Sequence, residues 1–499
     1  MPSRDLLRRR IFKLAVFVAT IFLLSKIFHT HSDDIYYRRQ LRQLDNEGTW
    51  ALARKFAHVP VEAPYKDKFH EVGLRARNIS QWLSITDRLR PGRKHAELLE
   101  ATERAASTLF PFLKNRPWRG LTFEYPLTDL RKLYAKGSQG VVIAVGGDGL
   151  PFRQAGQLLV DLRKVLDSQL PIQVAYAGDR HLTPAQREQL MSLDGFSNTE
   201  FLDVLSVFSD SNLDLSENDG AVKIFAVLAS KFEQVILLDA GAVLMKPPEA
   251  FFRAKPYTET GAYLFHDRLL WQYGLQERHR WLVDQVRDPS PEMSKSRVWT
   301  EGYAEEIDLG VVVVDKSRTD VLAGLLHTAW QNTRAVRDEV ASKPMYGGKE
   351  SWWLGLELSG AGYRFEDHYG AIIGWGETVI VDKAGKGRKT DERGDGEVEE
   401  QARVCSSAVA HVDENDELLW YSEGLLKNPL TDPEGYQVPR HWMIDGIWQK
   451  EATKEGTSCM VNNTMRALTP AQKGILGQSM QVAKQVDMAL AAGKETRYM

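Results

Sequence analysis

Residues 223–252 read KIFAVLASKFEQVILLDAGAVLMKPPEAFF. Apolar side chains recur at helical spacing over residues 224–231, whereas residues 235–238 form an unbroken apolar run of strand length. The stretch therefore predicts a helix, a short turn and a buried strand, with Asp239 at the carboxyl end of that strand. Ligands of open α/β sheets bind at this end of the strands, and the proline pair at 247–248 prevents the chain from continuing in a ladder.

The carboxylate of Asp239 has two interpretations at this position. It could hold a divalent cation that binds a diphosphate, since oxygen ligands suit Mg²⁺ and Mn²⁺ and the cation neutralises a departing nucleotide diphosphate. Alternatively, Asp239 only ends the strand or caps the next turn. The neighbouring motifs therefore decide how much weight the metal site receives.

The overall composition sets limits on the class of protein. The chain has 499 residues, of which 43% are hydrophobic and 26% charged, so it can bury a large core and has room for two or three domains. A formal net charge of −3 predicts no nucleic-acid partner. Cys405 and Cys459 are the only cysteines, which excludes a disulfide framework but leaves one bridge open.

The N-terminus carries a basic segment followed by an apolar one. We interpret residues 1–13 as a cytosolic tail and residues 14–28 as a transmembrane signal anchor, because the basic flank precedes the apolar run. A cleaved signal peptide has the same charge order, but no A-x-A-like site follows the run. Residues 29–136 are predicted to form a stem and helical preface, and the sequons at Asn78 and Asn462 agree with a lumenal location.

Strands and helices alternate after residue 137. The run VVIAV at 141–145 predicts a strand, and the following Gly146 and Gly147 would let backbone approach a nucleotide closely, although an ordinary turn explains them equally well. A helix over 152–168, a strand over 172–178 and a helix capped at Thr183 follow, and this order is typical of a Rossmann-like parallel sheet.

The second half has a mixed order with several charged candidates. Asp308 precedes the strand VVVV and could orient an acceptor hydroxyl or only face water. Lys349 could pair with phosphate, the tryptophans at 352–353 could stack on a sugar, and Glu350 could contact its hydroxyls or only favour a helix N-terminus. His411 ends a predicted strand over 404–412 and is either structural or part of a cation site. Residues 382–401 predict an exposed loop, and residues 447–499 a peripheral segment with a final helix over 471–490.

A set of ordered motifs then adds a resemblance. The motifs are K-x-x-A-x-x-x-S-x-F-E from Lys223, LLDA at 237–240, Pro248-Glu249, GVVVVDK at 310–316 and KESWWLG at 349–355. Together they resemble the fungal Golgi α-mannosyltransferases that extend mannan and O-linked mannose chains, including α-1,3- and α-1,2-mannosyltransferases.

The resemblance implies a fold, a reaction and a location. It implies a GT-A type domain over 137–446, a Rossmann-like mixed sheet flanked by helices, with GDP-mannose as donor, Mn²⁺ as cofactor and transfer with retention to a mannosylated glycan acceptor. It also implies a single-pass type II Golgi protein, with a Golgi glycosyltransferase complex as a further partner. By position, Lys223 would face the donor nucleotide, and Asp239 and His411 would be metal ligands. From the residues themselves we add Gly146, Gly147 and Lys349 as nucleotide-sugar candidates and Glu350 and Asp308 as catalytic candidates.

The sequence departs from the family pattern at two positions. Gly241 stands where D-x-D expects a second acid, and Gly348 where the family tends to have Asp before Lys-Glu. A glycine offers no side-chain oxygen, so weak metal use, metal-independent transfer and loss of activity all follow as alternatives. Two further hypotheses remain open: a UDP-sugar donor, and a catalytically silent member that acts as a complex subunit or carbohydrate-binding scaffold.

Overall fold

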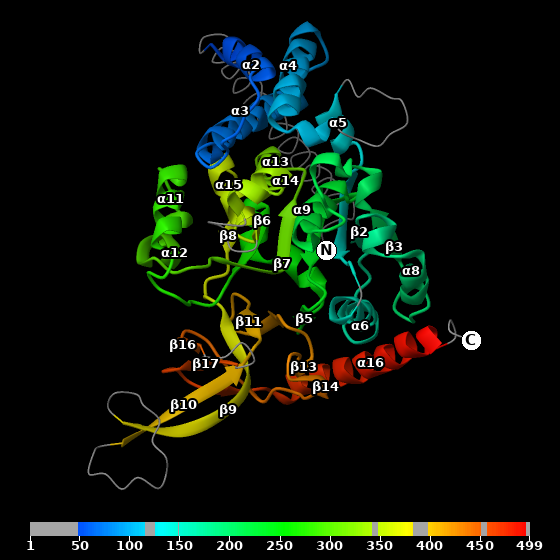
Figure 1. Ribbon diagram of the computed structural model, residues 1–499, viewed down its shortest axis with the longest axis vertical. Coiled ribbons are helices and arrows are strands. Elements are labelled where there is room, and N and C mark those ends of the chain that lie inside the picture. The colour runs from blue at the N-terminus through cyan, green and yellow to red at the C-terminus, as the bar shows by residue number, and fades with distance from the viewer. Residues whose placement is uncertain are drawn as a thin grey trace, which may run out of the picture.

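The structure, a computed structural model, describes residues 48–114, 125–147, 149–341, 348–382, 398–450 and 457–495. Helices surround a seven-stranded sheet, and a second sheet of nine strands lies below it in the view of Figure 1. The predicted tail at 1–13 and anchor at 14–28 lie outside the described residues. Within the described ranges, no helix is long and apolar enough to cross a bilayer.

The seven-stranded sheet has the order β3-β2-β1-β4-β7-β6-β8. Strands β1 to β4 are parallel, β7 runs antiparallel to both β4 and β6, and β8 is parallel to β6. The carboxyl ends of β1 to β4 and β6 therefore share one edge with the amino end of β7. This confirms the predicted mixed α/β class. The strand bounds are β1 Ala135–Ala144, β2 Ile172–Tyr176, β3 Thr199–Asp203, β4 Phe232–Leu238, β6 Ala262–His266, β7 Ile307–Asp315 and β8 Arg364–Phe365.

Alternation along the central strands buries both faces of this sheet. Val142, Leu237 and Val312 belong to one core cluster with the helices α9 and α13, whereas their strand neighbours Ile143 and Ile236 belong to another with α6 and part of α16. A strand that is buried on both faces is apolar throughout, which is why the unbroken run before Asp239 predicted it correctly. The helices of these layers are α6 Leu150–Lys164, α7 Gly178–His181, α8 Pro184–Met191, α9 Asp219–Ala229, α10 Lys255–Thr260, α13 Thr319–Gln331, α15 Ser351–Ser359 and α16 Pro470–Glu495.

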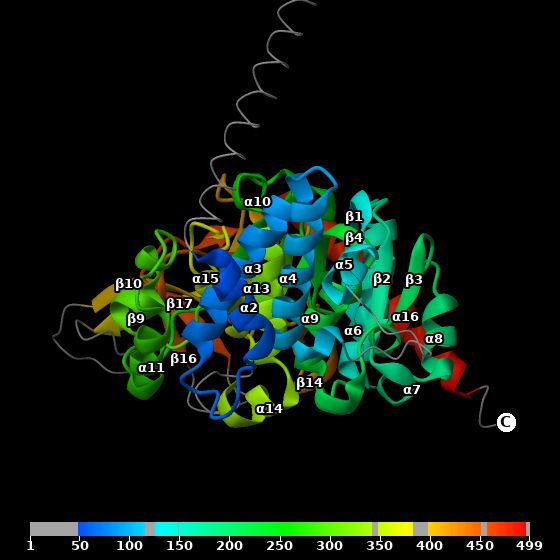
Figure 2. The same cartoon turned by 90° about the horizontal axis from the view of Figure 1, so that it is seen from above.

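The N-terminal helices cover one end of this core. Helix α3 packs against α4, α13 and α15, and Figure 2 shows α2 to α4 lying over α13 when the molecule is seen from above. Phe69 and Trp82 of α3 are buried in the same core cluster as the sheet. The amphipathic pattern of the predicted stem thus gives helices that pack on the sheet domain. Their bounds are α2 Thr49–His58, α3 Phe69–Arg88, α4 Arg93–Leu109 and α5 Pro126–Arg131, and the helices α11 Gln276–Val286, α12 Arg297–Glu301 and α14 Arg334–Val336 lie further along the chain.

The local signals predicted most elements of the first half. The predicted cap at Thr183 is confirmed, since its hydroxyl accepts from the Gln186 N–H and the Gln186 side chain bonds back in a capping box.

The single strand predicted over 404–412 is wrong. The chain forms β10 Val398–Ser406 and β11 Val409–Val412, because the register against β9 Ala371–Asp382 slips by one residue between them, as at a β-bulge.

The second sheet gathers the C-terminal part of the chain and has the order β16-β17-β10-β9-β11-β12-β5, with β15 and β18 beside it. Residues 398–401, predicted to lie in a loop, are strand residues of β10, and residues 383–397 lie outside the described residues. The segment 447–499, predicted to be peripheral, supplies β16 to β18 and helix α16, which packs against α6. Further bounds are β5 Val243–Leu244, β12 Leu418–Tyr421, β13 Leu426–Asn428, β14 Asp432–Tyr436, β15 His441–Met443, β16 Ile447–Lys450, β17 Ser458–Val461 and β18 Arg466–Ala467.

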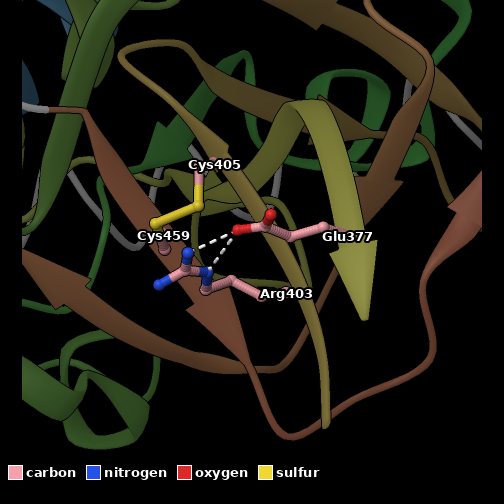
Figure 3. Close-up of a disulfide and its surroundings, with 4 residues drawn as sticks. All are labelled: Glu377, Arg403, Cys405 and Cys459. Carbon is pink, nitrogen blue, oxygen red and sulfur yellow. Dashed lines mark hydrogen bonds and ion pairs between the residues drawn. A yellow bond between two sulfur atoms is a disulfide. The ribbon is translucent and has the colours of Figure 1, made fainter. Parts of the chain in front are cut away.

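Figure 3 shows that the two cysteines form a disulfide. Cys405 of β10 and Cys459 of β17 face each other in the antiparallel register, 54 residues apart in sequence. The nearby Arg403 pairs with Glu377 of β9 on the exposed surface of the same ribbon. The bridge that the sequence left open therefore fastens the C-terminal strands to the long β9–β10 pair.

Candidate functional site

The candidate site lies at the shared strand edge of the seven-stranded sheet. Asp239 directly follows β4, and its N–H donates to the carbonyl of Gly310 in β7 at 2.9 Å. Asp308 is the second residue of β7, so antiparallel pairing of β4 and β7 brings the two aspartates to one place. The negative charge of Asp308 acts directly on the carboxyl group of Asp239. Two of the residues predicted from separate motifs are thus neighbours.

Asp239 forms an ion pair with Lys223 of α9. Its other carboxylate oxygen accepts from the N–H of Gly241 at 3.0 Å. Although burial opposes ionisation, the Lys223 ammonium and the Gly241 N–H hold the pKa of the Asp239 carboxyl below its usual value. The prediction that Lys223 and Asp239 belong to one site is consistent with this geometry, and the pair places a positive charge at the strand edge.

Gly146 and Gly147 follow β1 at the same edge. A side chain at Gly146 would overlap the ring of His181, because a Cβ there would lie 2.1 Å from Nε2. Gly147 has a φ of 65° and donates its N–H to the His181 carbonyl at 2.7 Å. His181 Nδ1 accepts from the N–H of Ala177, so Nε2 carries the proton and donates to Asp219 at 2.7 Å. Gly146 is therefore needed for close packing on His181, and Gly147 for its positive φ, and the backbone of both remains at the edge.

Asp308 and His411 lie together in the second half of the site. His411 Nε2 is 3.3 Å from Asp308, its Nδ1 bonds to Glu366, and its ring stacks on Trp420 at 4.1 Å. Burial lowers the pKa of His411, but the two carboxylates outweigh it and raise that pKa to about 9. His411 is therefore an imidazolium at neutral pH that donates from both nitrogens. In this protonation state it has no lone pair for a metal.

Lys349 and Glu350 are both paired with protein groups. The ammonium of Lys349 contacts Asp267 and lies 3.0 Å from Glu305, and these carboxylates raise its pKa despite burial. Glu350 is 1% exposed, accepts from the Trp353 indole N–H at 2.5 Å and lies 3.4 Å from Arg278. Burial raises the pKa of the Glu350 carboxyl. Glu350 therefore points into the protein, where it could act on a substrate only through its neighbours.

Two roles that the sequence suggested for residues near this edge are wrong. The tryptophans at 352–353, predicted as sugar-stacking platforms, are 2% and 0% exposed, since every residue of α15 is buried and the helix packs against α13 and α3. Asp308 does not merely face water, because its side chain is 13% exposed and bonds to His411 and to the Gly310 N–H at 2.8 Å. The buried Glu306 likewise accepts from Ser296 at 2.5 Å.

A cation between Asp239 and His411 does not fit the arrangement of these residues. The Lys223 ammonium already neutralises the charge of Asp239, and both nitrogens of His411 donate to carboxylates. Over the ranges the structure describes, no group of three or more His, Cys, Asp or Glu residues is arranged to hold a metal ion. We therefore assign no step to Mn²⁺. Gly241 has room for a side chain, since a Cβ there would lie 3.5 Å from Asp239 Oδ1 and from Gln154.

The structure adds acidic residues that the sequence analysis missed. Partial burial raises the pKa of the Glu423 carboxyl, and the charges of Asp308, Asp239 and Asp267 raise it further. Glu423 also has a φ of 73°, which is uncommon for a residue with a side chain. No local signal marks these residues, because Glu423 follows a short strand of the second sheet and Asp267 follows β6. We call Asp239, Asp267, Asp308 and Glu423 the acid cluster.

Comparison with known proteins places this site in a family. The family model described as "Mannosyltransferase putative" matches residues 138–413, which is more than half of the chain. The putative α-1,3-mannosyltransferase MNN1 of Candida albicans is 26% identical over 331 residues, covering 57% of this chain and 38% of that protein. The α-1,3-mannosyltransferase MNT3 of Saccharomyces cerevisiae is 29% identical over 238 residues, covering 42% of this chain and 35% of that protein.

A solved structure also matches part of the chain. The crystal structure of the galactosyltransferase LgtC with donor and acceptor sugar analogues covers 46% of this chain and 73% of that chain, at 11% identity and a TM-score of 0.26. At that score the likeness carries no argument. The match to the two curated relatives spans less than half of their length. The family match itself covers the strand edge from β1 to His411, and the chain belongs to this family of putative mannosyltransferases.

Proposed function

We propose that this protein transfers mannose from GDP-mannose to a mannosyl acceptor on glycoprotein glycans, with retention of the α configuration, by a domain of GT-A type. The observation that carries the proposal is the family match over residues 138–413, which contains the edge where Asp239 follows a buried strand beside Lys223. Ligands of α/β sheets bind at such an edge. The names of the relatives favour an α-1,3 linkage.

The residues at the edge suit the charge changes of this reaction. The bond from the mannose C1 to the diphosphate oxygen breaks, a bond from C1 to the acceptor oxygen forms, and the acceptor proton passes to the departing diphosphate. Lys223 would stabilise the negative charge that develops on the diphosphate. The backbone at Gly146 and Gly147 would lie along the nucleotide, and Asp308, held by His411, would orient a sugar hydroxyl.

The proposed location is the Golgi membrane, in single-pass type II orientation with the sheet domain in the lumen. The basic residues before the apolar run at 14–28 support this orientation. The disulfide between Cys405 and Cys459 supports an oxidising compartment. Protection of the sheet domain from protease in sealed Golgi vesicles, and its loss on adding detergent, would test the orientation.

A transfer assay with the detergent-solubilised full chain tests the activity. We expect GDP release from GDP-mannose to depend on an α-mannoside acceptor, and NMR of the product to show an α linkage. A protein that binds GDP-mannose but releases no GDP with any mannoside, with or without Mn²⁺, would contradict the proposal. A thermal-shift panel of GDP- and UDP-sugars separates the donors, because only a nucleotide sugar that binds the folded protein raises its Tm by mass action.

A second function is favoured by Gly241. A catalytically silent member that binds glycans as a subunit or scaffold would lack the second acid of D-x-D, as this chain does. Such a protein would bind mannosides without donor turnover. The same assay distinguishes it, since mannoside binding with no GDP release supports the scaffold and excludes the transferase.

A further inference from the structure

The two sequons of the chain lie in different structural settings. Asn78-Ile79-Ser80 belongs to helix α3, and Asn462-Asn463-Thr464 follows strand β17, in the upper and lower parts of Figure 1. A sequon accepts an oligosaccharide on the side-chain nitrogen of its asparagine, requires the hydroxyl residue two positions on, and is used where it lies in a surface loop. The setting of each sequon therefore decides which asparagine can carry a glycan.

The sequon at Asn78 is part of a packed helix. Asn78 lies in the middle of α3, and its Nδ2 donates to the Leu74 carbonyl of the preceding turn at 2.8 Å. Ser80 is 6% exposed, and its hydroxyl lies 3.4 Å from that of Thr319 in α13. Helices form within about a microsecond, whereas a chain is synthesised at about 5–20 residues per second, so α3 competes for this sequon from the start. Both groups that the modification needs are engaged in the fold.

The sequon at Asn462 is exposed over its whole length. Asn462, Asn463 and Thr464 are all exposed, and none of them belongs to a helix or a strand. Asn462 has a φ of 63°, in the left-handed region, and the chain leaves β17 at this residue. Its side-chain oxygen accepts from Gln401, but over the residues that the structure describes, its Nδ2 and the Thr464 hydroxyl have no hydrogen-bond partner.

The turn that carries Asn462 is held in place by its other residues. Asn463 Nδ2 donates to the Ile444 carbonyl at 2.8 Å, and the Asn463 side-chain oxygen accepts from the Thr464 N–H at 2.7 Å. The preceding strand β17 is buried, and the disulfide at Cys459 fastens it to β10. Asn463 therefore anchors the turn, and a substituent on Asn462 Nδ2 would displace no hydrogen bond of the fold.

Asn462 also lies beside an open strand edge. β16 is the last strand of the nine-stranded sheet, and its Ile447, which is 56% exposed, pairs with Val461, the neighbour of Asn462. Within the described ranges, the backbone of β16 bonds only to β17. Such an edge can pair with a strand of another chain unless something covers it. A hydrophilic oligosaccharide on Asn462 would lie next to this edge and hinder that pairing.

We propose that Asn462, rather than Asn78, carries an N-linked glycan, and that this glycan shields the edge of β16. The co-substrate is a lipid-linked oligosaccharide diphosphate. The bond from C1 of its first sugar to the diphosphate oxygen breaks, a bond from C1 to Asn462 Nδ2 forms, one amide proton passes to a base, and the lipid diphosphate leaves with the electron pair of the broken bond. The proposal rests on the proposed function, because only a lumenal sheet domain would meet this co-substrate.

Expression of the full chain in a eukaryotic host, followed by digestion with peptide-N-glycosidase, tests the site. We expect the wild type to lose one glycan as a single step in gel mobility, and mass spectrometry to find Asn462 converted to aspartate. Asn462→Gln and Thr464→Ala should each abolish the step, whereas Asn78→Gln should keep it. A step that persists in Asn462→Gln, or that disappears in Asn78→Gln, overturns the assignment.

A matched reporter separates this proposal from the proposed function. Ser197 and Asn198 are exposed in the turn before β3, and Thr199 follows them, so Ser197→Asn creates the same Asn-Asn-Thr sequence in another turn. If this variant gains a glycan there while Asn462 carries none, the proposed site is wrong and the lumenal location stands. If neither turn is modified, the glycan and the lumenal location are both overturned.

Sedimentation velocity of the detergent-solubilised full chain tests the shielding role. We expect Asn462→Gln to shift to larger sedimentation coefficients than the glycosylated wild type at the same concentration. Adding Ile447→Lys to Asn462→Gln should reverse the shift, because a charge on an edge strand blocks pairing with another chain. Circular dichroism should show that both variants are folded. Equal sedimentation of Asn462→Gln and the glycosylated wild type overturns the shielding role.

Discussion

The charged side chains on the two sides of the strand edge differ in their exposure to solvent. On the β1 to β4 side, Asp219 is 70% exposed, Asp239 40% and Lys223 17%. On the β6 and β7 side, His411 is 0% exposed, and its partners Glu366 and Asp308 are 3% and 13% exposed. Both sides contain ion pairs, but the pair of Lys223 and Asp239 can exchange a partner for a ligand at a lower cost than the buried pairs of His411 can.

This difference in exposure separates residues that can bind a ligand from residues that mainly stabilise the fold. A partly exposed ion pair contributes about 1 kcal/mol or less to stability, so Lys223 can exchange Asp239 for a phosphate group without loss of the fold. Breaking a buried pair by removing one partner costs about 3–5 kcal/mol, because a charge is left unpaired in the core. We therefore expect substitutions on the β1 to β4 side to change activity, and those on the other side to change stability first.

The largest expected effect is that of Glu366→Ala. It leaves the His411 imidazolium buried with only Asp308, and we expect the free energy of unfolding to fall by about 3–5 kcal/mol. Urea unfolding followed by tryptophan fluorescence measures it. Glu377→Ala is the matched control, because Glu377 pairs with Arg403 on the exposed ribbon of Figure 3 and should cost less than about 1 kcal/mol. Equal losses in the two variants would contradict the comparison.

The next effect is that of Lys223→Met, on the exposed side. Loss of one preorganised positive group should lower kcat/KM roughly 100-fold, which corresponds to about 2.7 kcal/mol of transition-state stabilisation. Stability should change by less than about 1 kcal/mol, since the pair with Asp239 is partly exposed. Lys223→Arg, which keeps the charge, should recover part of the activity. A variant that loses stability and activity in proportion would place Lys223 among the supporting residues instead.

The same difference between the two sides of the strand edge explains which site residues could be predicted from the sequence. On the β1 to β4 side, Asp239 and the glycines directly follow apolar runs, so local order places them at the edge. On the other side, His411 is 45 residues from Glu366 and 103 from Asp308, and only the packing of the two sheets brings the three together. His411 was chosen from its position at a strand end, but its partner Glu366 follows a two-residue strand that no periodicity marks.

The predicted role of His411 as a metal ligand depends on the same contacts. Sequence order suggested a ligand role for His411 by analogy with the family plan, but a ring nitrogen can bind a metal only when it is unprotonated. The two carboxylates that hold His411 as an imidazolium come from β7 and from the residue after β8. Their effect on its pKa depends on distances that the sequence does not contain.

Gly241→Asp tests the exposed side for a smaller effect. The new carboxylate has room at the Cβ and lies next to Asp239 Oδ1, so two acids would face one cation. We expect Mn²⁺ affinity, measured by electron paramagnetic resonance, to rise roughly tenfold. Gly241→Asn has the same shape without the charge and should raise it much less. Equal affinity in both variants would show that no cation binds at this end of β4.

The smallest expected effect concerns His368, which has the arrangement of His411 outside the strand edge. Its Nδ1 lies 2.9 Å from Asp445 and its Nε2 3.0 Å from Asp416, with the side chain 22% exposed. Burial lowers the pKa of His368, but the two carboxylates raise it above the usual value. The pair therefore stabilises the fold fully below the unfolded pKa, about 6.5, and loses this contribution as the pH rises through the folded pKa.

We expect His368→Gln to cost less than about 1 kcal/mol at pH 5.5 and less still at pH 9, as measured from Tm. His441→Gln is the control of opposite sign, because burial, with the nearby Lys473 and Arg440, lowers the pKa of His441. Its contribution is present above the unfolded pKa and is lost as the pH falls, so this variant should cost more at pH 9 than at pH 5.5. If His368→Gln cost as much as Glu366→Ala, burial would not be what separates the two histidine clusters, and the supporting role of the β6 and β7 side would need another cause.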